Sequence, residues 1–321
     1  MRNIFLNFST TEKYLKKAIL AIAASCLCLV LILSSGRLFT YAAEEPAQTY
    51  YIRSASDFIA YSQAYASGSR NPKDVLNISV DSGDQVVEDG FISLGTQTRP
   101  FAGTLNVPAV GIDVFRLFDC PLFDYVTTDL KITGSGNIKI IRERASDYPA
   151  AGVLTSGSLF ANHVLNGDSP ANWSVTFLPY TGDGTTSSSF ESLIGDIADN
   201  CDVTVTFTNN SNIPVSSAES AGLICGTLGQ NASLAVTTAG SGSNISVTSS
   251  GGNAGGLVGS MHNGSTLTFN SANNSHVNSV TSSTAYAGGI VGRAENINVV
   301  FDAGVSEYAV SGTVNGKTGA G

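Results

Sequence analysis

The chain has 321 residues, of which 13% are charged, 42% are hydrophobic and 34 are glycine. This much hydrophobic content argues against a disordered polar chain and indicates apolar side chains buried in many small portions. Without residues 1–42, 11 basic and 24 acidic residues remain, a net charge of −13. That charge excludes nucleic acid as a partner, because nucleic-acid binders use Lys and Arg to replace phosphate counterions.

The first segment has the pattern of an export signal. Lys13, Lys16 and Lys17 precede an apolar run over residues 18–35, and small residues follow. We predict that residues 1–43 form a hydrophobic leader helix, which acts as a signal peptide cleaved near Ala42 or Ala43. The alternative is an uncleaved anchor, since the run is at the lower limit for a membrane span. In both cases the basic cluster directs the remainder outward, to the cell surface or the extracellular space.

Residues 44–70 are predicted to form an extended segment and a short helix. Ser54 or Ser56 suits the N-cap, Asp57 suits the first turn, and Gly68 can end the helix. One stripe of the helix would carry Phe58, Ile59, Ser62 and Tyr65. We expect this helix to cover the first coil of the following region, because the end of a strand stack is an open edge.

A repeat of 33 residues dominates the second half of the chain. The dipeptide Ala-Gly recurs at residues 221, 254, 287 and 320, and glycine recurs at 226, 259 and 292. Ser-Val-Thr-Ser-Ser occurs at 246–250 and 279–283, with Ser216-Ser217 in the same frame. Two series of apolar residues follow the same period, with a one-residue deletion before the last member of each. They are Leu234, Leu267 and Val299, and Val236, Phe269 and Phe301.

Within each copy, apolar and polar residues alternate as in a β-strand with one buried face. One coil cannot bury that face, but stacked coils can. We therefore predict an all-β fold, a right-handed parallel β-helix over residues 71–321 that is most regular at 190–321. Looser copies begin at Leu122, Ser158 and Ser192, and residues 130–132 would continue the first of these as residues 173–177 continue the second.

Other repeat architectures fit less well. The leucine-rich pattern is missing, and ankyrin and tetratricopeptide repeats are helical, whereas this chain is rich in β-branched residues. A Greek-key β-sandwich remains open as the alternative fold.

The repeat motifs resemble those of a known family. Ala-Gly-Gly-Leu-Val-Gly at 254–259, Ala-Gly-Gly-Ile-Val-Gly at 287–292 and Ala-Gly-Leu-Ile-Cys-Gly at 221–226 are similar to GLUG repeats of bacterial surface proteins. Residues 54–58 and 101–105 are similar to the opening of such β-helix proteins. The resemblance covers about residues 50–321 and implies a fold rather than an activity. Some relatives of this kind are surface-attached peptidases.

The last dipeptide, Ala320-Gly321, matches the beginning of another coil. We therefore expect a fragment or an early-terminated product, with further repeats or domains following Gly321.

Candidate chemistry is sparse. Glycoside hydrolysis needs two carboxylates about 5–10 Å apart. The acidic candidates are Asp196, Asp199 and Asp202, and separately Asp81, Asp84, Glu88 and Asp89. The first set falls in a corner between strands, where Asp is a common turn residue, and neither set has the spacing of a calcium loop. We therefore predict no catalytic, cofactor-binding or metal residue.

The remaining reactive side chains favour structural roles. His163, His262 and His276 are too far apart for a local metal motif, and the last two are expected in exposed turns. Residues 181–185 lack the lysine of a phosphate loop. The sequons at Asn231 and Asn263 are interpreted as corners with left-handed backbone. The thiols outside the leader form no disulfide pattern and are expected as small buried residues: Cys120, Cys201 and Cys225.

The sequence thus predicts an exported surface scaffold or adhesin-like repeat protein without a cofactor. Its expected partners are host or cell-wall glycans or surface proteins. A β-helix carbohydrate-active enzyme and the N-terminal region of a larger surface peptidase are the alternatives.

Overall fold

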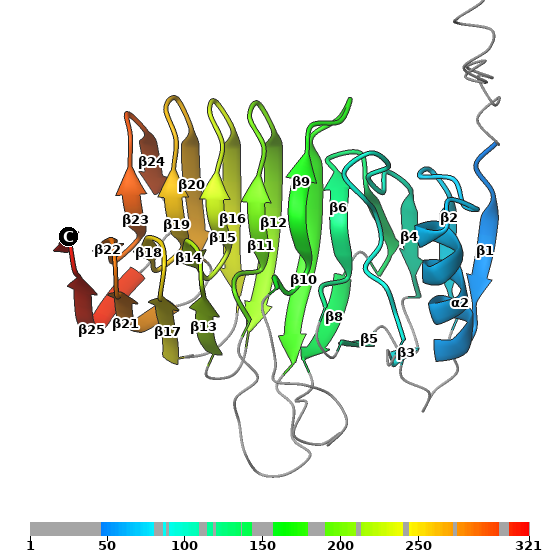
Figure 1. Ribbon diagram of the computed structural model, residues 1–321, viewed down its shortest axis with the longest axis horizontal. Helices are drawn as coiled ribbons and strands as arrows, with labels where there is room; N and C mark the ends of the chain where they lie inside the picture. Colours follow the sequence, from blue (N-terminus) through cyan, green and yellow to red (C-terminus); the bar gives the residue numbers. More distant parts are fainter. Residues whose placement is uncertain are drawn as a thin grey trace, which may run out of the picture. The chain divides into compact units, whose positions relative to one another are not determined.

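A computed structural model describes residues 46–79, 86–87, 90–108, 114–117, 120–135, 137–142, 157–178, 190–209, 213–239, 244–271, 275–301 and 308–320. These residues belong to one compact unit, Ala47–Gly321, apart from Pro46. The unit is a β-solenoid whose strands stack side by side in chain order, with one short helix at its beginning (Figure 1). The predicted leader helix lies outside the described residues.

Three sheets form the sides of the early and middle coils. The opening sheet contains β1 (Thr49–Ile52), β2 (Val75–Ile78), β4 (Thr104–Val107) and β7 (Lys131–Gly134). The eight-stranded sheet contains β3 (Val86–Val87), β5 (Val114–Leu117), β8 (Asn137–Arg142), β10 (Ala171–Leu178), β12 (Asp202–Asn209), β16 (Ser233–Ala239), β20 (Thr266–Ser271) and β24 (Asn298–Phe301). The six-stranded sheet contains β6 (Phe123–Thr127), β9 (Ala161–Leu165), β11 (Ile194–Ile197), β15 (Cys225–Leu228), β19 (Val258–Met261) and β23 (Val291–Ala294).

Two smaller sheets complete the later coils. One contains β13 (Ile213–Ser217), β17 (Asn244–Ser249), β21 (Ser275–Ser282) and β25 (Tyr308–Gly316). The other contains β14 (Ala221–Gly222), β18 (Ala254–Gly255), β22 (Tyr286–Gly288) and β26 (Gly319–Ala320). Neighbouring named strands in all five sheets are parallel. The predicted β-helix is confirmed, and the Greek-key sandwich is wrong because its sheets are antiparallel.

The predicted apolar ladders are confirmed. Leu234 pairs with Leu267, which pairs with Val299, and Val236, Phe269 and Phe301 align beside them. The members in the inner coils are fully buried, whereas Val299 and Phe301 in β24 are 37% and 45% exposed. Burial of each such side chain contributes roughly 1.5–3 kcal/mol, so stacking stabilises coils that would be unstable alone.

One predicted register is wrong by a residue. Ser216 pairs with Thr248 and Ser217 with Ser249, not with Ser249 and Ser250 as the 33-residue frame required. Along the same coil, Val205 pairs with Val236 and Ala221 with Ala254, so the offset grows from 31 to 33 residues. The corners absorb single-residue insertions while the strands stay aligned.

A second strand assignment also differs. Residues 130–132 were expected to continue an early coil in the manner of β10. Lys131 and Ile132 instead open β7, which pairs with β4 in the opening sheet, and β8 is the strand that pairs with β10. The early coils therefore have one side, the opening sheet, that the later coils lack and that the later repeat could not reveal.

The helix α2 (Ala55–Ala66) covers the first coil, as predicted (Figure 1). The Ser54 hydroxyl accepts a hydrogen bond from the Asp57 amide, and Gly68 follows the helix with φ +86°. The buried face contains Phe58, Ser62 and Tyr65 as expected, and also Tyr61, whereas Ile59 is only half-buried. Phe58 stacks on Phe91 with ring centroids 4.7 Å apart, so the helix closes the apolar interior.

Asp74 fixes this cap to the sheet. It is fully buried, and its carboxylate accepts hydrogen bonds from the Gln48 amide, the Asn71 amide and the Tyr61 hydroxyl. Burial raises the pKa of Tyr61, and the adjacent Asp74 carboxylate raises it further. The Tyr61 hydroxyl therefore stays protonated as a donor.

The corners and thiols largely match the sequence analysis. Asn231 has φ +54°, but in the second sequon the left-handed residue is Gly264 and not Asn263. Cys201 and Cys225 are buried and free, while Cys120 is half-buried. Burial raises the pKa of the Cys201 thiol to about 11. Over the described ranges no helix is long and apolar enough to cross a membrane; residues 18–35 lie outside them.

Candidate functional site

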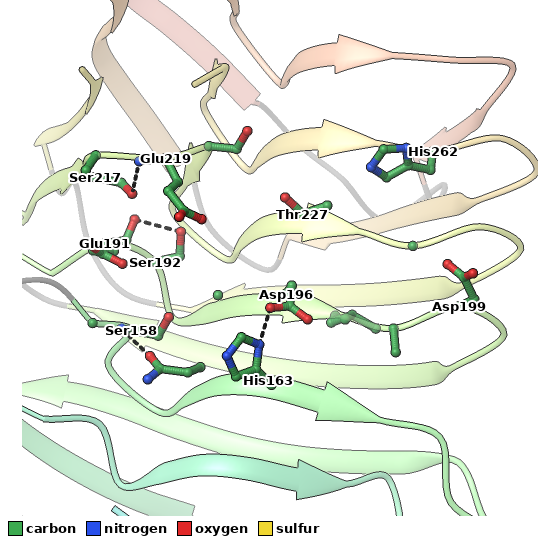
Figure 2. Close-up of a pocket in the computed structure, with 18 residues that line it drawn as sticks. Ser158, His163, Glu191, Ser192, Asp196, Asp199, Ser217, Glu219, Thr227 and His262 are labelled. Atoms are coloured by element: carbon green, nitrogen blue, oxygen red, sulfur yellow. Dashed lines mark hydrogen bonds and ion pairs between the residues drawn. The ribbon is translucent and has the colours of Figure 1, made fainter. Parts of the chain in front are cut away.

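A groove of about 620 Å³ lies along the six-stranded sheet and the corners beside it (Figure 2). Successive coils supply its walls, so residues far apart in sequence face the same space. The lining residues are Gly157, Ser158, Asn162, His163, Glu191, Ser192, Gly195, Asp196, Ile197, Ala198, Asp199, Ser217, Ala218, Glu219, Ser220, Thr227, Gly229 and His262.

Burial of the aliphatic residues in β11 directs the polar ones to the groove. Ile194 and Ile197 are 0% and 1% exposed in the core. Gly195 and Asp196 lie between them on the groove side. Asp196 aligns with His163 of β9 on one side and with Thr227 of β15 on the other. Parallel pairing therefore places one side chain from each coil in a row across the groove floor.

His163 and Asp196 form the central pair of this row. The Nδ1 atom of His163 contacts Oδ1 of Asp196 within hydrogen-bond distance (Figure 2). When the Asp196 carboxylate is ionised it can only accept, so Nδ1 then carries the proton; when Asp196 is protonated, Nδ1 accepts instead. The Tyr125 ring stacks on the imidazole at a centroid distance of 4.2 Å and holds its plane.

The surroundings of Asp196 oppose its ionisation. Burial raises the pKa of Asp196, the charge and hydrogen bond of His163 lower it, and the charge of Glu219 raises it. The net direction is upward. Carboxyl groups with a raised pKa are common in functional sites, because these sites hold them in surroundings that disfavour the ionised form.

Ser158 contributes a buried hydroxyl without a partner. Its residue is 1% exposed, and its Oγ forms no hydrogen bond with any residue that the structure describes. The corresponding residue of the next coil, Ser192, donates to the Glu191 carbonyl at 2.6 Å and accepts from the Gly222 amide at 3.3 Å. Both serines line the groove, and they differ in that Ser192 has hydrogen-bond partners whereas the Ser158 hydroxyl has none among the described residues.

Gly195 keeps the space beside Ser158 open. A Cβ at this position would lie 2.5 Å from the Asn162 carbonyl oxygen and 2.9 Å from the Ser158 hydroxyl. Both distances are shorter than real contacts allow, so a side chain here would displace the backbone of the neighbouring coil.

The acidic residues proposed from the sequence separate in the structure. Asp196 and Asp199 line the groove. The Asp199 carboxylate accepts a hydrogen bond from the backbone N–H of Gln230 at 2.7 Å and stabilises a corner between coils. Asp202 is not a lining residue, and it accepts from the Ser233 hydroxyl at 2.7 Å. The second acidic set, residues 81–89, lies outside the described residues. Glu191 and Glu219 join the groove from the corners, and the sequence analysis had not singled them out.

The three histidines also differ in whether they lie at the groove. His163 and His262 line one groove although they are far apart in sequence, because intervening coils stack between them. His262 is half-buried, not exposed as expected, since it sits at the groove margin. His276 lies in β21, and its side chain is outside the described set. Within the described part of the chain, no three His, Cys, Asp or Glu residues gather closely enough to hold a metal ion.

Comparison of the chain with protein-family models, with curated proteins and with solved structures finds no match.

Proposed function

We propose that this protein is an exported bacterial surface scaffold of the adhesin-like repeat type, which presents the groove to a ligand outside the cell. The β-solenoid is the observation that carries the proposal. Its coils align strand by strand over the described residues, with apolar side chains inward, so an extended surface is built without a large separate core.

Three features of the sequence support an extracellular location. The basic cluster and apolar run at the N-terminus are typical of an export signal. The GLUG-like motifs at 221–226, 254–259 and 287–292 resemble repeats of bacterial surface proteins. The acidic, charge-poor body suits a protein that does not contact phosphate polymers.

Display at the surface is tested by producing the full chain with a C-terminal tag in a bacterial host and treating intact cells with protease. We expect the tag to be lost from intact cells and N-terminal sequencing of released protein to begin near residue 43 or 44. A matched variant with Leu29→Arg and Leu31→Arg breaks the apolar run and should keep the tag protected inside. Protection of the unmodified chain would contradict the proposal.

The groove favours one alternative, a carbohydrate-active enzyme. Asp196 and Glu219 line it together, and the raised pKa of Asp196 suits a proton donor. Incubation with neutral and amino-sugar oligosaccharides, followed by mass spectrometry, tests this alternative. Release of shorter products that is lost in Asp196→Asn and Glu219→Gln would replace the scaffold proposal with an enzymatic one. The surface-peptidase alternative rests on the resemblance alone.

A further inference from the structure

The charge of the groove restricts its ligand. Glu191, Asp196, Asp199 and Glu219 line it; Asp196 is paired with His163, and Asp199 is bonded at a corner. Among the described residues that line the groove there is no Lys or Arg, and the groups able to carry positive charge are the imidazoles of His163 and His262. These carboxylates would repel a polyanion such as a uronic-acid polymer, whereas they would not repel a neutral or cationic ligand.

The carboxylates are not arranged to bind an inorganic cation. Calcium requires six to eight oxygen ligands at 2.3–2.6 Å around one point. Among the described residues no cluster of three potential ligand side chains meets that need. The negative charge therefore suits protonated groups spread along an organic ligand.

Hydroxyl and amide groups make up much of the remaining wall. Ser158 supplies a buried hydroxyl with no partner among the described residues. An unsatisfied buried hydroxyl is destabilising, and a ligand group that bonds to it recovers that cost. Thr227 and the His163 imidazole extend this polar surface along the same row.

We propose that the groove binds a saccharide segment with free amino groups, of the hexosamine type. Glu219 and Asp196 both line the groove (Figure 2). In the proposed complex, the carboxylate of Glu219 and the second oxygen of Asp196 accept hydrogen bonds from the ammonium groups of the sugar. Ser158 and Nε2 of His163 bond its hydroxyls. This inference deepens the proposed surface function by naming the ligand class. It rests on that function only for the location, outside the cell, at which the protein meets the ligand.

The test is isothermal titration of the purified full chain with the hexamer of glucosamine. The probes for comparison are the fully N-acetylated hexamer, polygalacturonate and hexalysine. We expect the glucosamine hexamer to bind, and the acetylated hexamer to bind at least about tenfold more weakly, because it lacks the charge-assisted hydrogen bonds. Polygalacturonate should not bind, and a metal chelator should change nothing.

Variants assign the binding to the named side chains. Asp196→Asn and Glu219→Gln should each weaken binding about tenfold, and Ser158→Ala should weaken it severalfold. The matched control is Glu295→Gln, which removes one negative charge from an exposed residue paired with Arg293 outside the groove, and it should bind normally. Circular dichroism and thermal melting confirm that each variant is folded.

Several outcomes would overturn the proposal. Equal binding of hexalysine would indicate a site for cationic peptides, and preferential binding of polygalacturonate would refute the charge argument. Unchanged affinity in both carboxylate variants would place binding elsewhere, and loss of binding on chelation would indicate a metal. Because titration uses purified protein, these failures leave the protease test of surface display unaffected.

Discussion

The early coils and the late coils of the solenoid are filled in different ways. A chain of aromatic contacts runs through the early coils from Phe101 to Phe123, Phe160 and Trp173, with successive centroids 5.2–5.6 Å apart. The late coils are filled mainly by aliphatic side chains. Backbone packs closely at glycine in both regions: a Cβ on Gly103 would lie 2.1 Å from the Asp74 carbonyl oxygen, and one on Gly259 would lie 2.6 Å from the Gly226 carbonyl oxygen.

This difference teaches that the regular sequence repeat and the packing of large aromatic side chains belong to different parts of one fold. The strict 33-residue repeat lies in the aliphatic region, and the irregular copies lie in the aromatic region. The groove lies where the two regions meet, because there successive coils still differ and non-repeated polar residues can gather.

The largest expected effect comes from truncating the aromatic core. Trp173 is 1% exposed, and its indole N–H donates to the Leu130 carbonyl at 3.0 Å. Trp173→Ala should lower the free energy of unfolding by about 3–5 kcal/mol, through a large cavity and an orphaned carbonyl. Val247→Ala in a late coil should cost about 2 kcal/mol. Urea denaturation followed by circular dichroism measures both, and equal costs would contradict the contrast between the two regions.

A smaller effect distinguishes the paired serines at the boundary. Ser192→Ala removes two hydrogen bonds and leaves the Gly222 amide unsatisfied, so it should cost about 1–2 kcal/mol. Ser158→Ala removes a hydroxyl that has no partner among the described residues, so stability should stay within about 0.5 kcal/mol or rise slightly. The same denaturation experiment compares them. A Ser158→Ala variant as unstable as Ser192→Ala would mean that the Ser158 hydroxyl is already bonded.

The smallest effect depends on pH. The folded-state pKa of Asp196 is raised, so as pH rises past its ordinary range the unfolded chain releases this proton before the folded chain does. Its ionised form therefore reduces stability at neutral pH, and this penalty disappears in acid. Asp196→Asn, which can still accept from His163, should raise the melting temperature by about 1–2 °C at pH 7 and leave it unchanged near pH 3. Stabilisation of the same size at both pH values would exclude ionisation as the cause.

The sequence predicted the coil-to-coil ladders better than the corners. Leu234, Leu267 and Val299 were aligned correctly because alternation and period both constrain buried strands. The Ser216 register and the sheet of residues 131–134 were wrong, because corner lengths vary without changing the strand pattern. The sequence analysis predicted no site residue and did not single out Glu219 or Ser158, because neither residue belongs to a recognisable local motif.

The sequence by itself determined that this protein is a stack of parallel coils, since apolar residues at a fixed interval can leave water only by covering one another. Tertiary structure alone decided which polar residues meet. Changes of one or two residues in corner length set the offset between coils, and that offset places His163 beside Asp196. Corners far apart in the chain then bring Glu191 and Glu219 to the same groove, a coincidence that no local pattern encodes.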